Sequence, residues 1–416
     1  FPLLVTSPWV VLVMAGAMTG FFRLTAHFGL LESVHGVERR SRGSEYYPLA
    51  IFLVFVLAGD DFAIYVSSVL VLGVADAFAA LVGSKWGRLR YTVQEDQKSI
   101  EGSAAFFLIA FAAIAIPGAF GDAETMGQVL LSAGIAATLL TGFEAVSLAG
   151  SDNLFVPVAA CVILQKQESD PVWMLLDQAL VLVGLLVVLV ALNRATGYMT
   201  ERRQTAFNSG GAIVSAMFAY AVWTLGGFDW AVPVLATFAG YVVTWVVAQQ
   251  FREAESRVAV RTTYRALLVP LAVLIVANTY DLYELLYGPF LAACSSVLAF
   301  GAWNRLRGSG MVGQGGERLV RAFAVGLIAG LLVILPATLL QPDAPVASAA
   351  ALVALLGPMT ALDAHAVDWY DLDPPASLWP GPNFYLSALT TLLALAAQFT
   401  GWLATWHPGL WNAVKM

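Results

Sequence analysis

Long uninterrupted apolar segments recur along the whole chain, and many reach about 18 residues or more. No water inside a bilayer can satisfy a backbone N–H or C=O group, so a crossing segment must form its hydrogen bonds internally, as an α-helix does. The apolar residues run continuously, whereas the strands of a membrane barrel alternate. Hydrophobic residues make up 59% and charged residues 12%, about half the charged share of a soluble domain. The sequence therefore predicts an all-α, polytopic, multi-pass integral membrane protein.

The apolar pattern predicts about fourteen transmembrane helices. They are expected over residues 8–31, 46–58, 61–83, 103–118, 126–149, 153–165, 172–192, 206–226, 229–249, 265–280, 284–303, 320–340, 345–362 and 383–405. The first is too long for the core of a signal peptide. Segments 46–58 and 153–165 are too short to cross straight, so they form half-helices or extend into their polar flanks. Cys161 and Cys294 lie in apolar segments and are expected in the core, with no disulfide or metal role.

Basic residues are distributed unevenly among the predicted loops. Five clusters fall on one side of the alternating map, namely Arg39–Arg42, Lys85–Lys98, Arg194–Arg203, Arg252–Arg265 and Arg305–Arg321. The positive-inside rule makes that side cytoplasmic. Segments 84–102 and 144–153 both lie on it, although two spans separate them. Polar groups from these two segments are therefore expected to meet at the cytoplasmic face.

Asp76 interrupts an otherwise apolar segment, where a carboxylate costs about 2.5–3.5 kcal/mol on insertion scales. At helical spacing Asp76, Ala79, Ala80 and Gly83 share one face. This face is small enough for a ligand or another helix to approach closely. The simpler interpretation is a helix-packing face with one hydrogen-bonded Asp. The cost of burying the carboxylate favours a functional site instead.

Two polar motifs follow Asp76 along the chain. Gly83-Ser84-Lys85-Trp86-Gly87 combines a cation with glycines that let a backbone approach a phosphate, although an ordinary helix cap explains it equally well. Lys98-Ser99-Ile100-Glu101-Gly102-Ser103 opens the next span. Ser99 is expected to cap that helix, Glu101 favours its positive end, and Lys98 would strengthen phosphate binding there.

Further oxygen donors follow after two more predicted spans. Glu144, Asp152 and Asn153 lie at the cytoplasmic end of an apolar pair of segments. Oxygen ligands together with phosphates are what Mg²⁺ prefers. The alternative is a polar turn in which Asp152 or Asn153 caps the next helix.

Taken together, these motifs resemble the CTP-dependent polyprenol and phytol kinase family, which includes dolichol kinase and a CTP-using diacylglycerol kinase. The resemblance covers about residues 39–165 and rests on Arg42–Leu49, Asp76–Gly87, Lys98–Ser103 and Glu144 with Asp152–Pro157. Ser151 stands where the family usually has a carboxylate. The family is distantly similar to CDP-diacylglycerol synthase, which shares the Asp…Gly…Lys-x-x-Glu-Gly layout and also uses CTP.

The resemblance implies Mg²⁺-dependent transfer of a phosphoryl group from CTP to a long-chain isoprenoid alcohol, such as phytol or a polyprenol, at the cytoplasmic face. Asp76 and Asp152 would bind the metal, and Glu101 or Glu144 would orient or deprotonate the lipid hydroxyl. The residues expected to bind the nucleotide are Gly83, Lys85, Gly87, Lys98, Ser99, Gly102 and Asn153. The expected partners are the lipid alcohol, the nucleotide and the bilayer, with no nucleic acid, and the sequence carries no signal for an oligomeric state.

Residues 1–194 are thus expected to form the kinase-like domain, and residues 195–416 a second helical membrane domain. Thr205–Ala212 and Gly226–Trp230 are faintly similar to a family that includes a phytyl-phosphate kinase, so a fused two-step kinase is one alternative. That family's acidic signature is missing, because the nearest segment, Ala292–Ala299, has no carboxylate.

Two weaker patterns occur in this second half. A degenerate repeat would align Leu291–Arg307 with Val69–Gly87 and place Cys294 where Asp76 stands. Asp363, His365, Asp368, Asp371 and Asp373 are expected in a loop, and a solvated loop is favoured there over a metal site.

Three other functions compete with a lipid-alcohol kinase. A cytidylyltransferase acting on a lipid phosphate would use the same nucleotide. A transporter would suit the many spans, but it should carry charges near the midplane of both halves. Residues 195–416 could also form a non-catalytic, lipid-binding scaffold.

Overall fold

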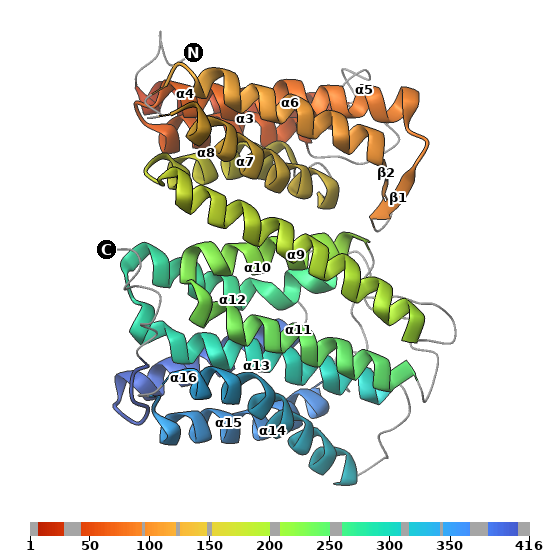
Figure 1. The fold of residues 1–416 in the computed structure, drawn as a ribbon, viewed down its shortest axis with the longest axis vertical. Coiled ribbons are helices and arrows are strands. Elements are labelled where there is room, and N and C mark those ends of the chain that lie inside the picture. The colour runs from red at the N-terminus through yellow and green to blue at the C-terminus, as the bar shows by residue number, and fades with distance from the viewer. Residues whose placement is uncertain are drawn as a thin grey trace. The chain divides into compact units, whose positions relative to one another are not determined.

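The computed structural model describes residues 7–28, 43–93, 96–121, 125–147, 152–199, 209–249, 260–308, 316–341, 344–366 and 382–406. These residues are mostly helical, as the apolar pattern predicts, and they include one two-stranded sheet (Figure 1). The chain divides into two compact units, Phe1–Gly184 and Leu185–Met416. The assignment of separate functional domains to residues 1–194 and 195–416 stays a prediction.

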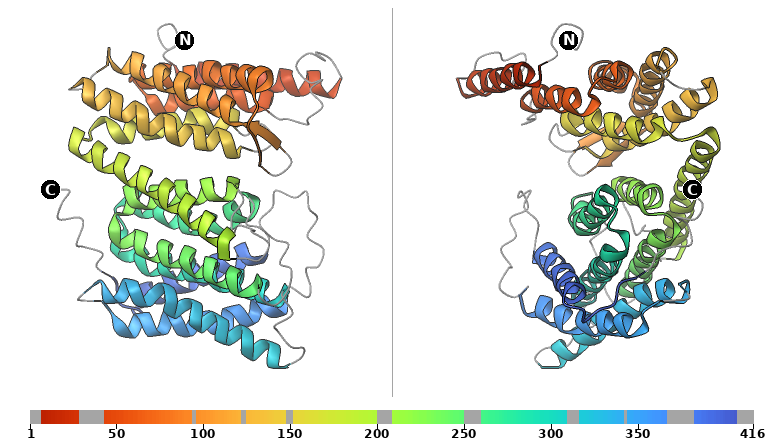
Figure 2. Two further views of the ribbon diagram at one scale, coloured as in Figure 1. Left: turned by 45° about the vertical axis from the view of Figure 1, so that its right-hand side comes forward. Right: turned by 90° about the vertical axis from the view of Figure 1, so that its left-hand side faces the viewer.

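The first unit is a bundle of helices that run side by side (Figure 2). Its helices are α1 (Pro8–His27), α3 (Gly43–Ala58), α4 (Phe62–Leu70), α5 (Asp76–Trp86), α6 (Ile100–Gly118), α7 (Met126–Val146), α8 (Asp152–Glu168) and the start of α9 (Val172–Met199). Both short predicted spans extend into their polar flanks, because α3 begins at Gly43 and α8 covers Asp152–Glu168.

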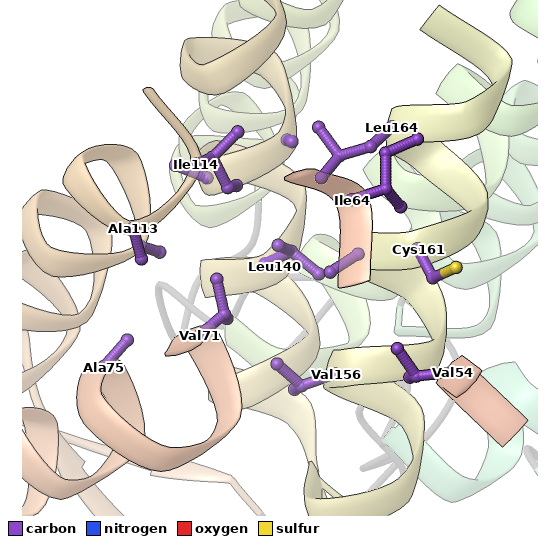
Figure 3. Packing of buried hydrophobic residues seen from close by; sticks show 14 of the residues in the cluster. Val54, Ile64, Val71, Ala75, Ala113, Ile114, Leu140, Val156, Cys161 and Leu164 are labelled. Carbon is purple, nitrogen blue, oxygen red and sulfur yellow. The ribbon is translucent and has the colours of Figure 1, made fainter. Parts of the chain in front are cut away.

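The core of this unit is filled by small and branched aliphatic side chains. Val71 and Ala75 lie beside Leu140 of α7 and Val156 of α8, and all four are almost completely buried (Figure 3). Cys161 belongs to the same core as a free thiol, as expected from its apolar segment. Because lipid is as apolar as the side chains, such helices associate through close packing, which small residues permit.

A π-helical segment, η1 (Val71–Ala75), joins α4 to α5 and ends directly before Asp76. The three pieces form one continuous helix over Phe62–Trp86. A π segment turns the residues that follow it relative to the preceding helix, and such segments are frequent at functional sites. The apolar sequence pattern gave no sign of it, because the side chains on both sides are equally apolar.

A β-hairpin follows α5, where the sequence predicted only a loop. Strands β1 (Arg90–Val93) and β2 (Asp96–Ser99) pair antiparallel, with Tyr91 opposite Lys98. Ser99 ends the hairpin and begins α6, so the register of these strands determines where Lys98 lies relative to the helix ends.

The second unit packs around one central helix. Its helices are the rest of α9, then α10 (Ser209–Gly226), α11 (Phe228–Gln249), α12 (Val260–Tyr280), α13 (Tyr283–Gly308), α14 (Gly316–Leu339), α15 (Val346–Ala366) and α16 (Pro382–Phe399). In helix α13, 83% of the residues of the most apolar 18-residue stretch are buried, and the helix contacts α11, α12, α14, α15 and α16. Trp230 anchors the packing, with ring centroids 4.6 Å from Phe290 and 5.3 Å from Tyr287. Cys294 is a buried free thiol on α13, also as expected.

Every predicted apolar segment contains a helix, but a count of about fourteen spans is not confirmed. Among the described residues, eight helices are long and apolar enough to cross a membrane, and five apolar helices are shorter. The eight are Pro8–Thr25, Phe62–Trp86, Ile100–Gly118, Met126–Val146, Phe228–Ala248, Tyr283–Arg307, Glu317–Leu339 and Val346–His365. The architecture is therefore that of an all-α protein with several membrane-spanning candidates.

The prediction of a loop at Asp363 and His365 is wrong. Both residues belong to α15, and Asp363 is fully buried. The helix continues through them because the neighbouring Ala361, Leu362 and Ala364 are strong helix formers. The other acidic residues of this segment, Asp368, Asp371 and Asp373, lie outside the described residues.

Candidate functional site

Four elements of the first unit bring polar side chains together. Asp76 begins α5 after the π segment, and Lys98 lies near the end of β2. Glu144 lies in the last turn of α7, and Asp152 begins α8. Lys98, Glu144 and Asp152 lie close to helix ends. Asp76 instead lies inside the continuous helix Phe62–Trp86, directly after its π segment. The predicted contact between segments 84–102 and 144–153 is confirmed for Lys98 with Glu144 and Ser147. Its location at the cytoplasmic face stays a prediction.

Lys98 and Glu144 form the central contact of the site. The Lys98 ammonium lies 2.7 Å from Glu144 Oε1, and it also donates to the Glu144 backbone carbonyl. The two side chains are only 15% and 11% exposed. The carbonyls at the end of α7 carry partial negative charge, so they add to the attraction for the ammonium.

Ser147 connects this ion pair to Asp152. The Lys98 ammonium donates to Ser147 Oγ over 3.3 Å, and Ser147 Oγ lies 3.0 Å from Asp152 Oδ2. The other Asp152 oxygen, Oδ1, accepts from the backbone N–H of Asn153 at 3.1 Å. Asp152 therefore accepts from the next residue of its own helix and also faces the Lys98–Glu144 pair. Its predicted role as a helix cap stays a prediction.

Asp76 faces the same charges from α5. Its carboxylate is repelled by Asp152 and Glu144 and attracted by Lys98. Within the described part of the chain, the Asp76 carboxylate accepts no hydrogen bond. The partly buried carboxylate thus lacks the donor that a purely structural buried Asp would be expected to have.

The donor set fits a divalent cation held jointly with phosphate. Glu144 Oε2 is buried and has no hydrogen-bond donor among the described residues. The Asp76 carboxylate accepts no hydrogen bond among the described residues, and each Asp152 oxygen accepts one there and keeps a further lone pair for a cation. No three His, Cys, Asp or Glu side chains of the described segments are grouped closely enough to hold a metal unaided. Mg²⁺ commonly uses one or two carboxylates together with phosphate oxygens and water, so two acidic side chains suffice for such a site.

Glu101 forms hydrogen bonds away from the Lys98–Glu144 pair. Its carboxylate oxygens accept from the backbone N–H of Leu89 at 3.1 and 3.3 Å. Glu101 therefore ties the start of α6 to the residue before the hairpin. Of the two candidate bases, Glu144 lies among the clustered charges and Glu101 supports the hairpin backbone.

The predicted glycines let α5 approach the start of α6 closely. A Cβ added to Gly102 would lie 3.0 Å from the Ala79 carbonyl oxygen, and one added to Gly87 would lie 2.8 Å from the Ser99 Cβ. A Cβ on Gly83 would lie 3.1 Å from Ser99 Oγ. Ser99 is the N-cap of α6, as predicted, and its Oγ accepts from the Gly102 N–H at 3.1 Å. Close helix packing accounts for all three glycines, and their binding of phosphate stays a prediction.

Two further predicted nucleotide-binding residues have other contacts. Lys85 is exposed, and its ammonium lies 4.9 Å from the Trp86 ring centroid. Asn153 contributes its backbone N–H to Asp152. Their roles in nucleotide binding stay predictions.

Sequence reasoning assigned no role to three polar residues at this site. Tyr91 pairs with Lys98 across the hairpin, and its hydroxyl lies 2.7 Å from Ser103 Oγ. Burial raises the pKa of Tyr91 above its usual value, the Ser103 hydrogen bond lowers it, and the charge of Glu144 raises it. Ser147, three residues after Glu144, is the third. Ser147 could have been found from the sequence, because its hydroxyl lies close to the suspected functional carboxylate of Glu144. Tyr91 could be found only once the register of the two strands was known.

Comparison with known proteins supplies one informative relative. No protein-family model matches the chain, and no solved structure matches it. A phytol kinase from Synechocystis sp. (strain ATCC 27184 / PCC 6803 / Kazusa) is 34% identical over 159 residues, which is 37% of this chain and 67% of the relative. The distant likeness to CDP-diacylglycerol synthase has no support from these comparisons. On the identity and coverage of the phytol kinase match, the chain belongs to the phytol kinase-like family.

Proposed function

We propose that the chain is an integral-membrane kinase that transfers the terminal phosphoryl group of CTP to the hydroxyl of a long-chain isoprenoid alcohol. The relative named phytol kinase supports the reaction and the class of acceptor. The observation that carries the proposal is the convergence of Asp76, Lys98, Glu144 and Asp152 from separate elements. Phosphoryl transfer requires mainly positioning and neutralisation of charge, and such a cluster can supply both.

Asp76 and Asp152 are the residues that would hold Mg²⁺, together with the nucleotide phosphates. A bound Mg²⁺ ion neutralises phosphate charge and orients the phosphoryl group for in-line transfer. The unsatisfied Asp76 carboxylate supports this assignment, because a negative group held among other negative groups gains most from a cation.

Lys98 would bind the nucleotide phosphates, and Glu144 would act as the general base. The phosphates of the nucleotide compete with Glu144 for the Lys98 ammonium, and the Glu144 carboxylate is thereby released. Glu144 then accepts the proton of the lipid hydroxyl while the alcohol oxygen bonds to the terminal phosphorus and the bond to CDP breaks. We assign the proton to Oε2, the buried oxygen that lacks a donor among the described residues. Glu101 is the alternative base.

The lipid and the nucleotide would reach the site from different phases. The lipid tail lies between apolar helices, and its hydroxyl reaches the rim of the bundle. By the positive-inside rule, the side of the membrane that carries the basic loops is the cytoplasmic one, and CTP would enter the site from there. The choice of CTP rests on the family resemblance.

Product analysis tests this function. The purified full chain in nanodiscs is incubated with Mg²⁺, a panel of isoprenoid alcohols and CTP labelled at either the α- or the γ-phosphate. A kinase transfers the γ label alone and forms a lipid monophosphate. Incorporation of the α label into a CDP-lipid would instead identify a cytidylyltransferase. Nucleotide-independent substrate flux into proteoliposomes, without lipid phosphorylation, would identify a transporter.

A matched pair of variants links the activity to the site. Asp76→Asn should abolish measurable transfer, because it removes one of the two proposed metal ligands. Asp60→Asn alters an exposed carboxylate in the turn before the same long helix and should keep wild-type activity. Equal activity of the two variants would refute the assignment of Asp76.

A further inference from the structure

Among the described residues, Ser147 is the one side chain that forms hydrogen bonds to both Lys98 and Asp152. Its hydroxyl has a single proton and two lone pairs. The Lys98 ammonium can only donate, and the ionised Asp152 carboxylate can only accept. The proton of Ser147 therefore points to Asp152 Oδ2 at 3.0 Å, and a lone pair faces Lys98 Nζ at 3.3 Å. The hydrogen bonds run in one direction, from Lys98 through Ser147 to Asp152.

We propose that Ser147 is a positioning residue for phosphoryl transfer. It holds a phosphate-binding ammonium and a metal-binding carboxylate in one fixed geometry. The inference rests on the proposed kinase function, in which Lys98 contacts the nucleotide and Asp152 the metal. Residues that orient metal ligands in this way commonly contribute 10-fold to 100-fold to metal affinity or activity.

The structural role of Ser147 does not depend on its hydroxyl. Ser147 ends α7 through its backbone, because its N–H donates to the Glu144 carbonyl at 3.3 Å. Its φ of −62° and ψ of 147° lie in the extended region, which valine and threonine adopt readily. Its side chain is only partly buried, and each substitution tested below adds one methyl group to it. Changing the hydroxyl alone therefore leaves the helix end intact.

The test compares two substitutions of nearly the same shape. Ser147→Thr keeps the hydroxyl, and Ser147→Val replaces it with a methyl group. Thr138→Ala is the control on the same helix, because the Thr138 hydroxyl bonds, within the described segments, only to the Gly134 carbonyl of its own helix, at 2.8 Å. Each full-length protein is assayed in nanodiscs for kcat, for KM of the lipid alcohol, for Mn²⁺ binding in the presence of nucleotide by electron paramagnetic resonance, and for Tm.

We expect Ser147→Val to lose 10-fold or more in kcat and in Mn²⁺ affinity. Its KM for the alcohol should stay within about twofold, because the hydroxyl orders groups on the nucleotide side. Ser147→Thr and Thr138→Ala should match the wild type within about threefold. Equal kcat and equal Mn²⁺ affinity of Ser147→Val and Ser147→Thr would overturn the proposal, whatever their Tm.

The same experiment separates a failure of this inference from a failure of the proposed function. A wild-type protein that forms no lipid monophosphate refutes the kinase. The Mn²⁺ comparison between Ser147→Val and Ser147→Thr still decides whether the hydroxyl organises a cation site.

Discussion

Removing one partner of the Lys98–Glu144 pair should destabilise the first unit by a measurable amount. At 2.7 Å and an effective dielectric constant of about 20, the direct attraction is about 6 kcal/mol. Desolvation offsets much of this, and deletion of one partner from a buried pair typically costs about 3–5 kcal/mol. Lys98 keeps the Glu144 carbonyl and Ser147 Oγ as acceptors. We therefore expect Glu144→Leu to cost about 2–3 kcal/mol.

The double variant distinguishes a coupled pair from two independent residues. Lys98→Met alone should cost a similar amount, because it leaves Glu144 buried without its cation. With both changes no unpaired charge remains, and an apolar pair in place of a buried ion pair is often neutral. Lys98→Met/Glu144→Leu should therefore lie within about 1 kcal/mol of the wild type, although the single changes sum to about 4–6 kcal/mol.

The two free cysteines provide the assay. Both are buried, so each reacts with a thiol-specific fluorophore only after unfolding. Cys294→Ala leaves Cys161 as the reporter for the first unit, because the chain has 2 cysteines. At about 2–4 °C per kcal/mol for a unit of this size, each single change should lower Tm by roughly 5–10 °C.

An exposed ion pair serves as the comparison. Arg321 and Glu317 lie 3.2 Å apart on α14, with side chains 50% and 74% exposed. With Cys294 as the reporter, Glu317→Gln should change stability by less than about 0.5 kcal/mol. A single variant of Lys98 or Glu144 within 1–2 °C of the wild type would refute the reasoning, as would a double variant that shows the full sum of the two losses.

Three further predictions concern packing, charge and catalysis. Gly102→Ala should cost about 1–3 kcal/mol in thermal unfolding, because its Cβ has no room, whereas Gly16→Ala meets nothing within 4 Å and should be neutral. The raised pKa of Tyr91 means that the folded state holds this proton more tightly, so stability falls as pH rises beyond 10; Tyr91→Phe should lose less stability there. Glu144→Gln should lower kcat at least about 100-fold and Glu101→Gln less than threefold, and the reverse order would make Glu101 the base.

The location of the helices was largely predictable from the sequence. Apolar segments must satisfy their own backbone groups, so each predicted segment contains a helix. The cap at Ser99 was equally accessible, because capping depends on residues only three positions apart. The C-terminal end of α15 was predicted wrongly. The acidic residues from Asp363 onward suggested a loop, but their helix-forming neighbours continue the helix to Ala366.

The contacts of the site were less accessible. Lys98 and Glu144 are 46 residues apart, and their pairing depends on the strand register that places Lys98 opposite Tyr91. The two candidate bases look alike in sequence, but Glu101 accepts from Leu89 and Glu144 from Lys98. No local pattern separates these two environments.

By itself, the sequence determined that the chain is helical and apolar and that Ser99 begins a helix as its cap, because hydrophobic length and local caps act within a few residues. Only the tertiary structure decided that a π segment precedes Asp76 and that Ser147 joins Lys98 to Asp152. Such relations depend on how separate helices pack and rotate against one another. A shift of the hairpin or of the π segment by one residue would point these side chains away from one another, and amino-acid composition does not reveal such a shift.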